Sequence, residues 1–165
     1  MKLKIVVDHE LEPLNAQQTI LKNEFTLYKE LSLIQSSNNF ITPPIGIQMS
    51  KPSVHPSFGR DTEFEKPDSL INDILEYKLT KVHVDTRAAW LPHKEQWNCK
   101  SNESIVYSGF VMPSGTYCIV IIEFLVDNGV TEKFDAHDSY KSDDIEDFLI
   151  IAQENQETIL AEKES

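Results

Sequence analysis

The sequence predicts an α+β fold in one domain, residues 1–165, with a small antiparallel sheet and helices packed on one face of it. Three observations lead to this prediction. The chain has 165 residues, of which 40% are hydrophobic and 25% charged, as is typical of a single globular domain. Apolar residues recur at two-residue intervals in some segments and at three- and four-residue intervals in others, which indicates both strands and helices. The late strands are joined by short links, and short links require antiparallel pairing.

The first third of the chain predicts one strand, one long helix and one long loop. Residues 2–7 are rich in β-branched side chains and predict a strand. A helix is expected to begin at Asn15, because apolar residues then recur at helical spacing. These residues are Ile20, Leu21, Phe25, Tyr28 and Leu31. Residues 36–56 contain four prolines and no periodicity, which predicts a long loop that is either functional or a tolerated insertion.

The rest of the chain predicts a short helix, three strands and a terminal helix. The short helix begins after a proline, and the first of the strands alternates apolar and polar side chains. Two acidic residues in the first turn of the terminal helix are expected to stabilise it, because they lie at the positive end of the helix dipole. The predicted elements are a helix at 67–77, strands at 79–86, 104–110 and 116–125, and a helix from Ser142.

The charge of the chain is negative and unevenly distributed. Fifteen Lys and Arg residues stand against 27 Asp and Glu residues, a net charge of −12, which argues against generic binding of naked nucleic acid. Residues 135–165 hold ten acidic residues and two lysines, so the first 134 residues carry only −4. The charge of the whole chain therefore does not decide what a site in the earlier part can bind. The acidic helix and tail at residues 143–165 form a separate feature.

Several classes of protein are excluded by what the sequence lacks. No segment is long and apolar enough to span a membrane, and the short apolar start does not form a signal-peptide core, so a cytoplasmic location is expected. Cys99 and Cys118 do not form a Cys-x-x-Cys pair, which excludes a disulfide framework. Common phosphate-loop, dinucleotide and metalloprotease motifs are absent, and no cofactor is expected. Residues 135–138 are more typical of an acidic surface than of a metal site.

Two short segments place a cationic side chain beside a group that can transfer a proton or orient the cation. Strand alternation places Lys81, His83 and Asp85 on one face. A cation beside an imidazole can bind a phosphate while the imidazole moves a proton. In the other segment a glycine precedes Arg60, whose guanidinium Asp61 can orient. Each segment is also compatible with a structural role, the first as a solvated strand face and the second as a turn.

Several short strings and one apolar strand follow one another along the chain. They are Phe25-x-x-Tyr28-Lys29, Phe58-Gly59-Arg60-Asp61, Val82-His83-Val84, Pro92 with Gln96, Val106-Tyr107, the strand from Thr116 to Leu125, and His137 followed by Phe148. Their order and approximate spacing resemble the YafO-like toxins of bacterial type II toxin–antitoxin systems. The resemblance implies the small ribonuclease architecture of RelE-type toxins. It also implies a metal-independent, ribosome-dependent endoribonuclease, an mRNA interferase that inhibits translation. The implied partners are mRNA on the ribosome and a cognate antitoxin protein.

The resemblance also implies a set of site residues. The expected catalytic residues are Arg60, His83, His137 and Tyr107, the expected substrate-binding residues are Lys81 and Asp61, and no metal ligand is expected. Arg60 is expected to hold the scissile phosphate and His83 to move a proton, with one of the other two catalytic residues assisting. Lys81 is a second contact for phosphate, and Asp61 is expected to orient Arg60.

Two other classes of function are compatible with the sequence. A non-enzymatic binding module would place its acidic C-terminal helix on a basic surface of a partner. Removal of residues 143–165 would then abolish binding, whereas replacing His83 would not. A small-molecule enzyme would instead use a pocket near Trp90 and Trp97.

Overall fold

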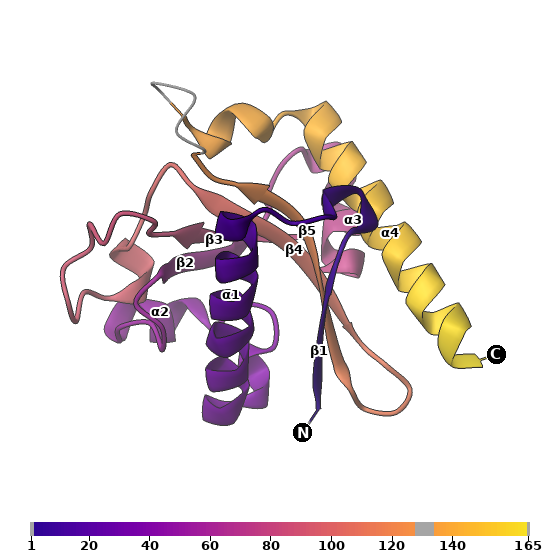
Figure 1. The fold of residues 1–165 in the computed structure, drawn as a ribbon, viewed down its shortest axis with the longest axis horizontal. Coiled ribbons are helices and arrows are strands. Elements are labelled where there is room, and N and C mark those ends of the chain that lie inside the picture. Colours follow the sequence, from indigo (N-terminus) through magenta and orange to yellow (C-terminus); the bar gives the residue numbers. More distant parts are fainter. Residues whose placement is uncertain (1, 128–133, 165) are drawn as a thin grey trace.

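A computed structural model describes residues 2–127 and 134–164 as a five-stranded mixed sheet with helices on both faces (Figure 1). The order of strands across the sheet is β1-β5-β4-β3-β2. The strands are β1 (Leu3–Val7), β2 (Phe58–Glu63), β3 (Thr80–Val84), β4 (Ser104–Val111) and β5 (Tyr117–Leu125). The helices are α1 (Ala16–Gln35), α2 (Ile45–Ser50), α3 (Ile71–Tyr77) and α4 (Ser142–Glu164). The predicted α+β class is confirmed.

The predicted antiparallel sheet is wrong at one edge. The pairs β2–β3, β3–β4 and β4–β5 are antiparallel, but β1 pairs with β5 in parallel. The first strand reaches β5 only after more than a hundred intervening residues, so no short link constrains its direction. Pairing across such a sequence distance cannot be deduced from local periodicity.

The prediction that helices cover one face of the sheet is also wrong. Ile119 and Ile121 of β5 pack under α1, whereas Val120 and Ile122 pack against α3 and α4. A strand that is apolar on both sides must be covered on both sides. The apolar run in β5 was therefore the sign of a sheet buried between two helical layers.

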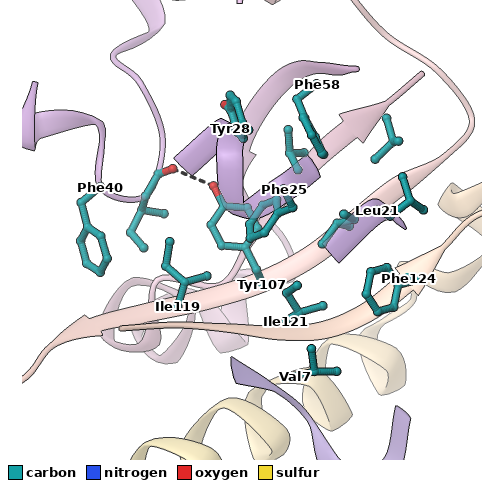
Figure 2. Packing of buried hydrophobic residues seen from close by; sticks show 14 of the residues in the cluster. Val7, Leu21, Phe25, Tyr28, Phe40, Phe58, Tyr107, Ile119, Ile121 and Phe124 are labelled. Carbon is teal, nitrogen blue, oxygen red and sulfur yellow. Dashed lines mark hydrogen bonds between the residues drawn. The ribbon is translucent and has the colours of Figure 1, made fainter. Parts of the chain in front are cut away.

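Helix α1 covers one face of the sheet. Its start is fixed by a capping box, in which Asn15 and Gln18 each accept a hydrogen bond from the other's main-chain amide, at 2.8 and 3.1 Å. Leu21 and Phe25 then point into the core, beside Tyr107 of β4 (Figure 2). Complete burial of one such side chain stabilises the fold by about 1.5–3 kcal/mol.

Helices α3 and α4 cover part of the opposite face. Ile74 of α3 and Ile145 of α4 are fully buried against Val106 of β4. The two helices leave the β2 and β3 end of this face open to a groove. Among the helices of the described ranges, none combines the length and the apolar character that crossing a membrane requires.

Two elements form where the sequence predicted a loop and a turn. Residues 45–50 of the expected loop form α2, and Phe58–Glu63 form the edge strand β2. The side chain of Gln48 donates to the carbonyl oxygen of Asp61 at 2.9 Å and accepts from its amide at 3.0 Å. The Gln48 side chain thus takes the hydrogen bonds that a neighbouring strand would otherwise make at this edge. Local propensity does not predict such a contact, because it comes from a separate segment.

Candidate active site

An open groove with a volume of about 770 Å³ lies on the sheet face that α3 and α4 leave uncovered. Strands β2 and β3 supply its floor, and the segments around residues 64–66, 97–102 and 137–140 supply its walls. Its charged residues, apart from histidine, are Arg60, Lys66, Lys81 and Lys100 against Glu63 and Glu65. A chain with a net charge of −12 therefore has an excess of positive charge in this groove.

Arg60 faces the groove because of an irregularity in β2. Strict alternation from Phe58 would place Arg60 on the α1 face and Asp61 on the groove face. The register with β3 shifts between Phe58 and Asp61, so both of these residues face α1 and Arg60 lines the groove. A bulge of this kind redirects a side chain without ending the strand. Only glycine fits at position 59, because a Cβ there would lie 2.1 Å from the carbonyl oxygen of Cys99.

Trp97 holds the Arg60 side chain in two ways. Nε of Arg60 donates to the carbonyl oxygen of Trp97 at 2.8 Å, and the guanidinium carbon lies 4.0 Å from the centroid of the Trp97 ring. Burial lowers the pKa of Arg60 from its ordinary value, but an arginine stays charged in proteins. Within the described residues no hydrogen bond engages its two terminal nitrogens, so they can bind an anion with paired donors.

His83 is a buried imidazole whose Nδ1 contacts the main chain of Ser101. Nδ1 lies 2.9 Å from the carbonyl oxygen of Ser101 and 3.0 Å from its amide nitrogen. Desolvation lowers the pKa of His83 to about 4, with smaller contributions from the charges of His137, Lys81 and Arg60. His83 is therefore neutral near pH 7, and its Nε2 is the nitrogen available to a ligand.

His137 lies across the groove from His83, with 6.3 Å between the ring centroids. Its Nδ1 is 2.7 Å from Oδ1 of Asp135, which also accepts the main-chain amide of His137 at 2.9 Å. These hydrogen bonds lower the pKa of Asp135, so the carboxylate stays ionised and fixes the ring. In the two ranges that the structure describes, no three His, Cys, Asp or Glu side chains group closely enough to hold a metal ion.

The aromatic rings of Tyr140 and Phe64 pack against His137 and Lys81, respectively. The Tyr140 hydroxyl shares a hydrogen bond with the hydroxyl of Ser104, and its ring packs 5.4 Å from that of His137. Burial raises the pKa of Tyr140 to about 12, so it stays neutral. Nζ of Lys81 lies 4.1 Å from the centroid of the Phe64 ring. Burial lowers the pKa of Lys81, and a cation with little water around it gains more from binding a phosphate.

Tyr107 and Asp61, two of the expected site residues, lie on the other face of the sheet. Tyr107 is fully buried beneath α1, beside Phe25 (Figure 2). The carboxylate of Asp61 accepts hydrogen bonds from Tyr107 at 2.6 Å, Tyr28 at 2.7 Å and Lys29 at 3.2 Å. Neither residue reaches the groove. The interaction that orients the Arg60 guanidinium comes from Trp97, and the expectation that Asp61 orients it is wrong.

Lys29 and Asp61 form an ion pair with both side chains completely buried. Burial raises the pKa of Asp61 and lowers the pKa of Lys29, while their mutual attraction opposes both shifts. Lys29 also donates to the carbonyl oxygen of Ile41 and to the hydroxyl of Tyr107. The pair is therefore fully hydrogen-bonded, as a buried charge must be.

A polar network connects this ion pair to the segment that carries Arg60. Nε2 of Gln96 donates to the hydroxyl of Tyr28 and to the carbonyl oxygen of Gly59, both at 2.9 Å. Gln96 begins the short 3-10 helix Gln96–Asn98, which also contains Trp97. The network thus fixes the bulge in β2 and the residue that stacks on Arg60, although it lies outside the groove.

The structure brings together four of the six expected site residues and adds two that were missed. Arg60, Lys81, His83 and His137 line one groove. Trp97 was considered only for a small-molecule pocket with Trp90, but the two tryptophans line different cavities. Tyr140 has no sequence signal, because it is an isolated aromatic residue in a connection.

The chain matches the family model "Toxin YafO, type II toxin-antitoxin system" over residues 48–156, about two-thirds of its length. This range contains β2 to β5 and all four expected residues that line the groove. No curated protein and no solved structure matches the chain, so the RelE-like architecture stays a prediction. A type II system implies a cognate antitoxin as partner. The chain belongs to the YafO toxin family of type II toxin–antitoxin systems.

Proposed function

We propose that the chain is an endoribonuclease that cleaves mRNA on the ribosome in the cytoplasm and so inhibits protein synthesis. The observation that carries the proposal is the positively charged groove in which Arg60 and Lys81 lie with His83 and His137. Two imidazoles and two cations are the groups that phosphodiester cleavage by acid–base catalysis requires. Membership of a toxin family also supports a role in inhibiting growth.

The reaction is a transfer of the phosphoryl group within the RNA strand. The ribose 2′-hydroxyl oxygen attacks the neighbouring phosphorus, so that an O2′–P bond forms and the P–O5′ bond breaks. One imidazole accepts the proton of the 2′-hydroxyl, and the other donates a proton to the departing 5′ oxygen. Arg60 and Lys81 bind the non-bridging oxygens, on which negative charge develops. The products are a 2′,3′-cyclic phosphate and a 5′-hydroxyl end, and the reaction needs no metal ion.

The surroundings of the two histidines support different roles. His83 is neutral near pH 7, because its pKa is about 4, and is assigned the base. Nδ1 lies within hydrogen-bond distance of both the carbonyl oxygen and the amide of Ser101. The base role requires the tautomer in which Nδ1 donates to that carbonyl, because only then does Nε2 have a free lone pair for the 2′-hydroxyl. A phosphate bound beside it raises the pKa of His83 toward the working pH. His137 is more exposed and paired with Asp135, and is assigned the proton donor.

The charge of the protein supports a requirement for the ribosome. A net charge of −12 repels free RNA at long range, and the groove has only a small cationic excess to oppose this repulsion. A ribosome that already holds the mRNA in place removes the need for strong independent binding. Cleavage is therefore expected on translated mRNA and not on free RNA.

Expression of the toxin in growing bacteria tests this function. Wild-type protein is expected to stop growth and to create new RNA 5′ ends, and Arg60→Ala and His83→Ala are each expected to relieve the arrest. The new ends should carry a 5′-hydroxyl and should disappear from an mRNA whose start codon has been removed. His9→Ala is the matched control, because His9 is exposed and does not line the groove.

Three results would contradict the proposal in separate ways. Full toxicity of both variants would remove the groove residues from the mechanism. New ends that carry a 5′-phosphate would exclude attack by the 2′-hydroxyl. Equal cleavage of translated and untranslated mRNA would exclude the requirement for the ribosome.

A further inference from the structure

Helices α3 and α4 enclose a second groove, with a volume of about 440 Å³, that shares no residue with the cationic groove. Leu70 and Tyr77 line it from one side, and Leu149 and Ile150 line it from α4. Figure 1 shows the two helices side by side, away from α1. Ile150 keeps 52% of its surface exposed. A partner that covers this aliphatic side chain would gain the free energy of removing it from water.

The shape of this groove fits an elongated ligand. Its lining residues on α4 are Glu146, Leu149, Ile150 and Gln153, and those on the other side are Leu70, Asp73 and Tyr77. Both sets follow the three- and four-residue spacing of one helix face, so the groove runs along the helices for about two turns, or ~10 Å. Grooves between two helices receive the apolar face of an amphipathic segment.

The rim of the groove is acidic on both sides. Asp73 and Glu146 are exposed lining residues, and residues 142–162 contain seven acidic residues and neither lysine nor arginine. Desolvation raises the pKa of Tyr77 in the groove, and the carboxylates of Glu76, Glu157 and Asp73 raise it further. Carboxylates of α3 and of α4 therefore both lie close enough to Tyr77 to influence its hydroxyl. A partner that covers the groove must bring positive charge, because like charges brought together would oppose binding.

We propose that the α3–α4 groove is the docking site for the cognate antitoxin, and that its occupant is a basic amphipathic segment of that protein. An apolar anchor of the segment packs on Leu149 and Ile150, and flanking lysines or arginines pair with Asp73 and Glu146. This inference depends on membership of a type II family and not on the proposed nuclease activity.

Calorimetry with the toxin and its cognate antitoxin tests the proposal. Ile150→Asp removes the apolar contact, and the double variant Asp73→Lys with Glu146→Lys reverses the rim charge. Each is expected to weaken binding at least about tenfold, as loss of a central contact does. Binding by the wild-type toxin should also weaken at high salt. Val111→Asp is the matched control, because Val111 is 53% exposed on β4 and does not line this groove.

The variants also separate this inference from the proposed nuclease. Asp73 and Glu146 are exposed and Ile150 and Val111 are about half exposed, so the melting temperature of each variant should stay within a few degrees of the wild-type value. In cells, Ile150→Asp should stay toxic when the antitoxin is present, whereas Val111→Asp should be neutralised. If no variant is toxic at all but the pattern of affinities holds, the nuclease proposal fails and the docking site stands.

Two results would overturn the docking site. One is an unchanged affinity for the antitoxin in both the Ile150→Asp and the charge-reversed proteins. The other is a toxin dimer, detected by light scattering, that Ile150→Asp abolishes without changing antitoxin affinity. In that case the groove would receive a second copy of this chain.

Discussion

The two faces of the sheet carry the same kinds of charged group in opposite situations. On the α1 face, Lys29 and Asp61 are completely buried and satisfy each other at 3.2 Å. On the groove face, Lys81 and Arg60 lie over aromatic rings beside open solvent. The charge on the first face is compensated within the protein, whereas the charge on the second is left for a ligand. The bulge in β2 turns Arg60 toward the groove and Asp61 toward α1, so one strand contributes to both stability and binding.

The largest expected effect is on the buried face, from Lys29→Met. This change leaves the carboxylate of Asp61 buried without its cation, which is expected to cost about 3–5 kcal/mol. Urea denaturation measures the free energy of unfolding. Lys51→Met is the control, because Lys51 is exposed and should cost little. If Lys29→Met lowers the free energy of unfolding by less than about 1 kcal/mol, Asp61 does not depend on Lys29 for its charge compensation, and the contrast between the two faces fails.

The next effect concerns His83 and depends on pH. The folded protein does not protonate His83 until about pH 4, whereas an unfolded histidine does so near its ordinary pKa of about 6.5. The unfolded state therefore binds more protons between these values, so stability falls as the pH is lowered from about 6.5 to 4. The part due to His83 is about 3 kcal/mol, and His83→Gln should remove it. If the variant and the wild type lose equal stability over this range, His83 is not held neutral by burial.

Trp97→Leu tests how the groove face holds its cation. The change removes the ring under Arg60 but keeps the main-chain carbonyl that accepts from Nε. A cation–π contact contributes about 0.5–2 kcal/mol, so the rate of RNA cleavage should fall by about two- to thirtyfold. Trp97→Phe should restore part of this loss. A cleavage rate unaffected by Trp97→Leu would show that the hydrogen bond alone positions Arg60.

The smallest effect on stability is expected from Lys81→Met, the counterpart of Lys29→Met. Among the described residues the carboxylate that acts on Lys81 is that of Glu65, which is exposed and would not be left buried without a partner. Methionine also keeps an apolar contact with Phe64. The free energy of unfolding should change by less than about 1 kcal/mol, while growth arrest by the toxin weakens. A loss comparable to that of Lys29→Met would place Lys81 in the structural core.

Most of the fold could be predicted because its helices and strands show their own periodicity. The exceptions depend on distant partners. Strand β2 has low intrinsic β-propensity around Gly59 and Asp61, and side chains from Gln48 and Gln96 hold it in place. The parallel pairing of β1 and the second helical layer likewise depend on contacts between remote segments.

The site could be predicted only in part, and the bulge explains much of the difference. Alternation placed Lys81 and His83 correctly on one face of β3. Alternation could not place Arg60 and Asp61 correctly, because the register of β2 shifts between Phe58 and Asp61. This shift turns Arg60, and not Asp61, toward the groove. Tyr107 belonged to a string shared with the toxin family, but such a string does not distinguish a buried residue from a catalytic one.

The outer side of β2 has a consequence for how other chains can approach the protein. An edge strand with unpaired amides and carbonyls invites a foreign strand to extend the sheet. Here the carbonyl of Gly59, the amide of Arg60 and both main-chain groups of Asp61 already bond to Gln96, Cys99 and Gln48. The stretch from residue 59 to 61 is therefore closed to strand addition, and this cover protects it from edge-to-edge aggregation.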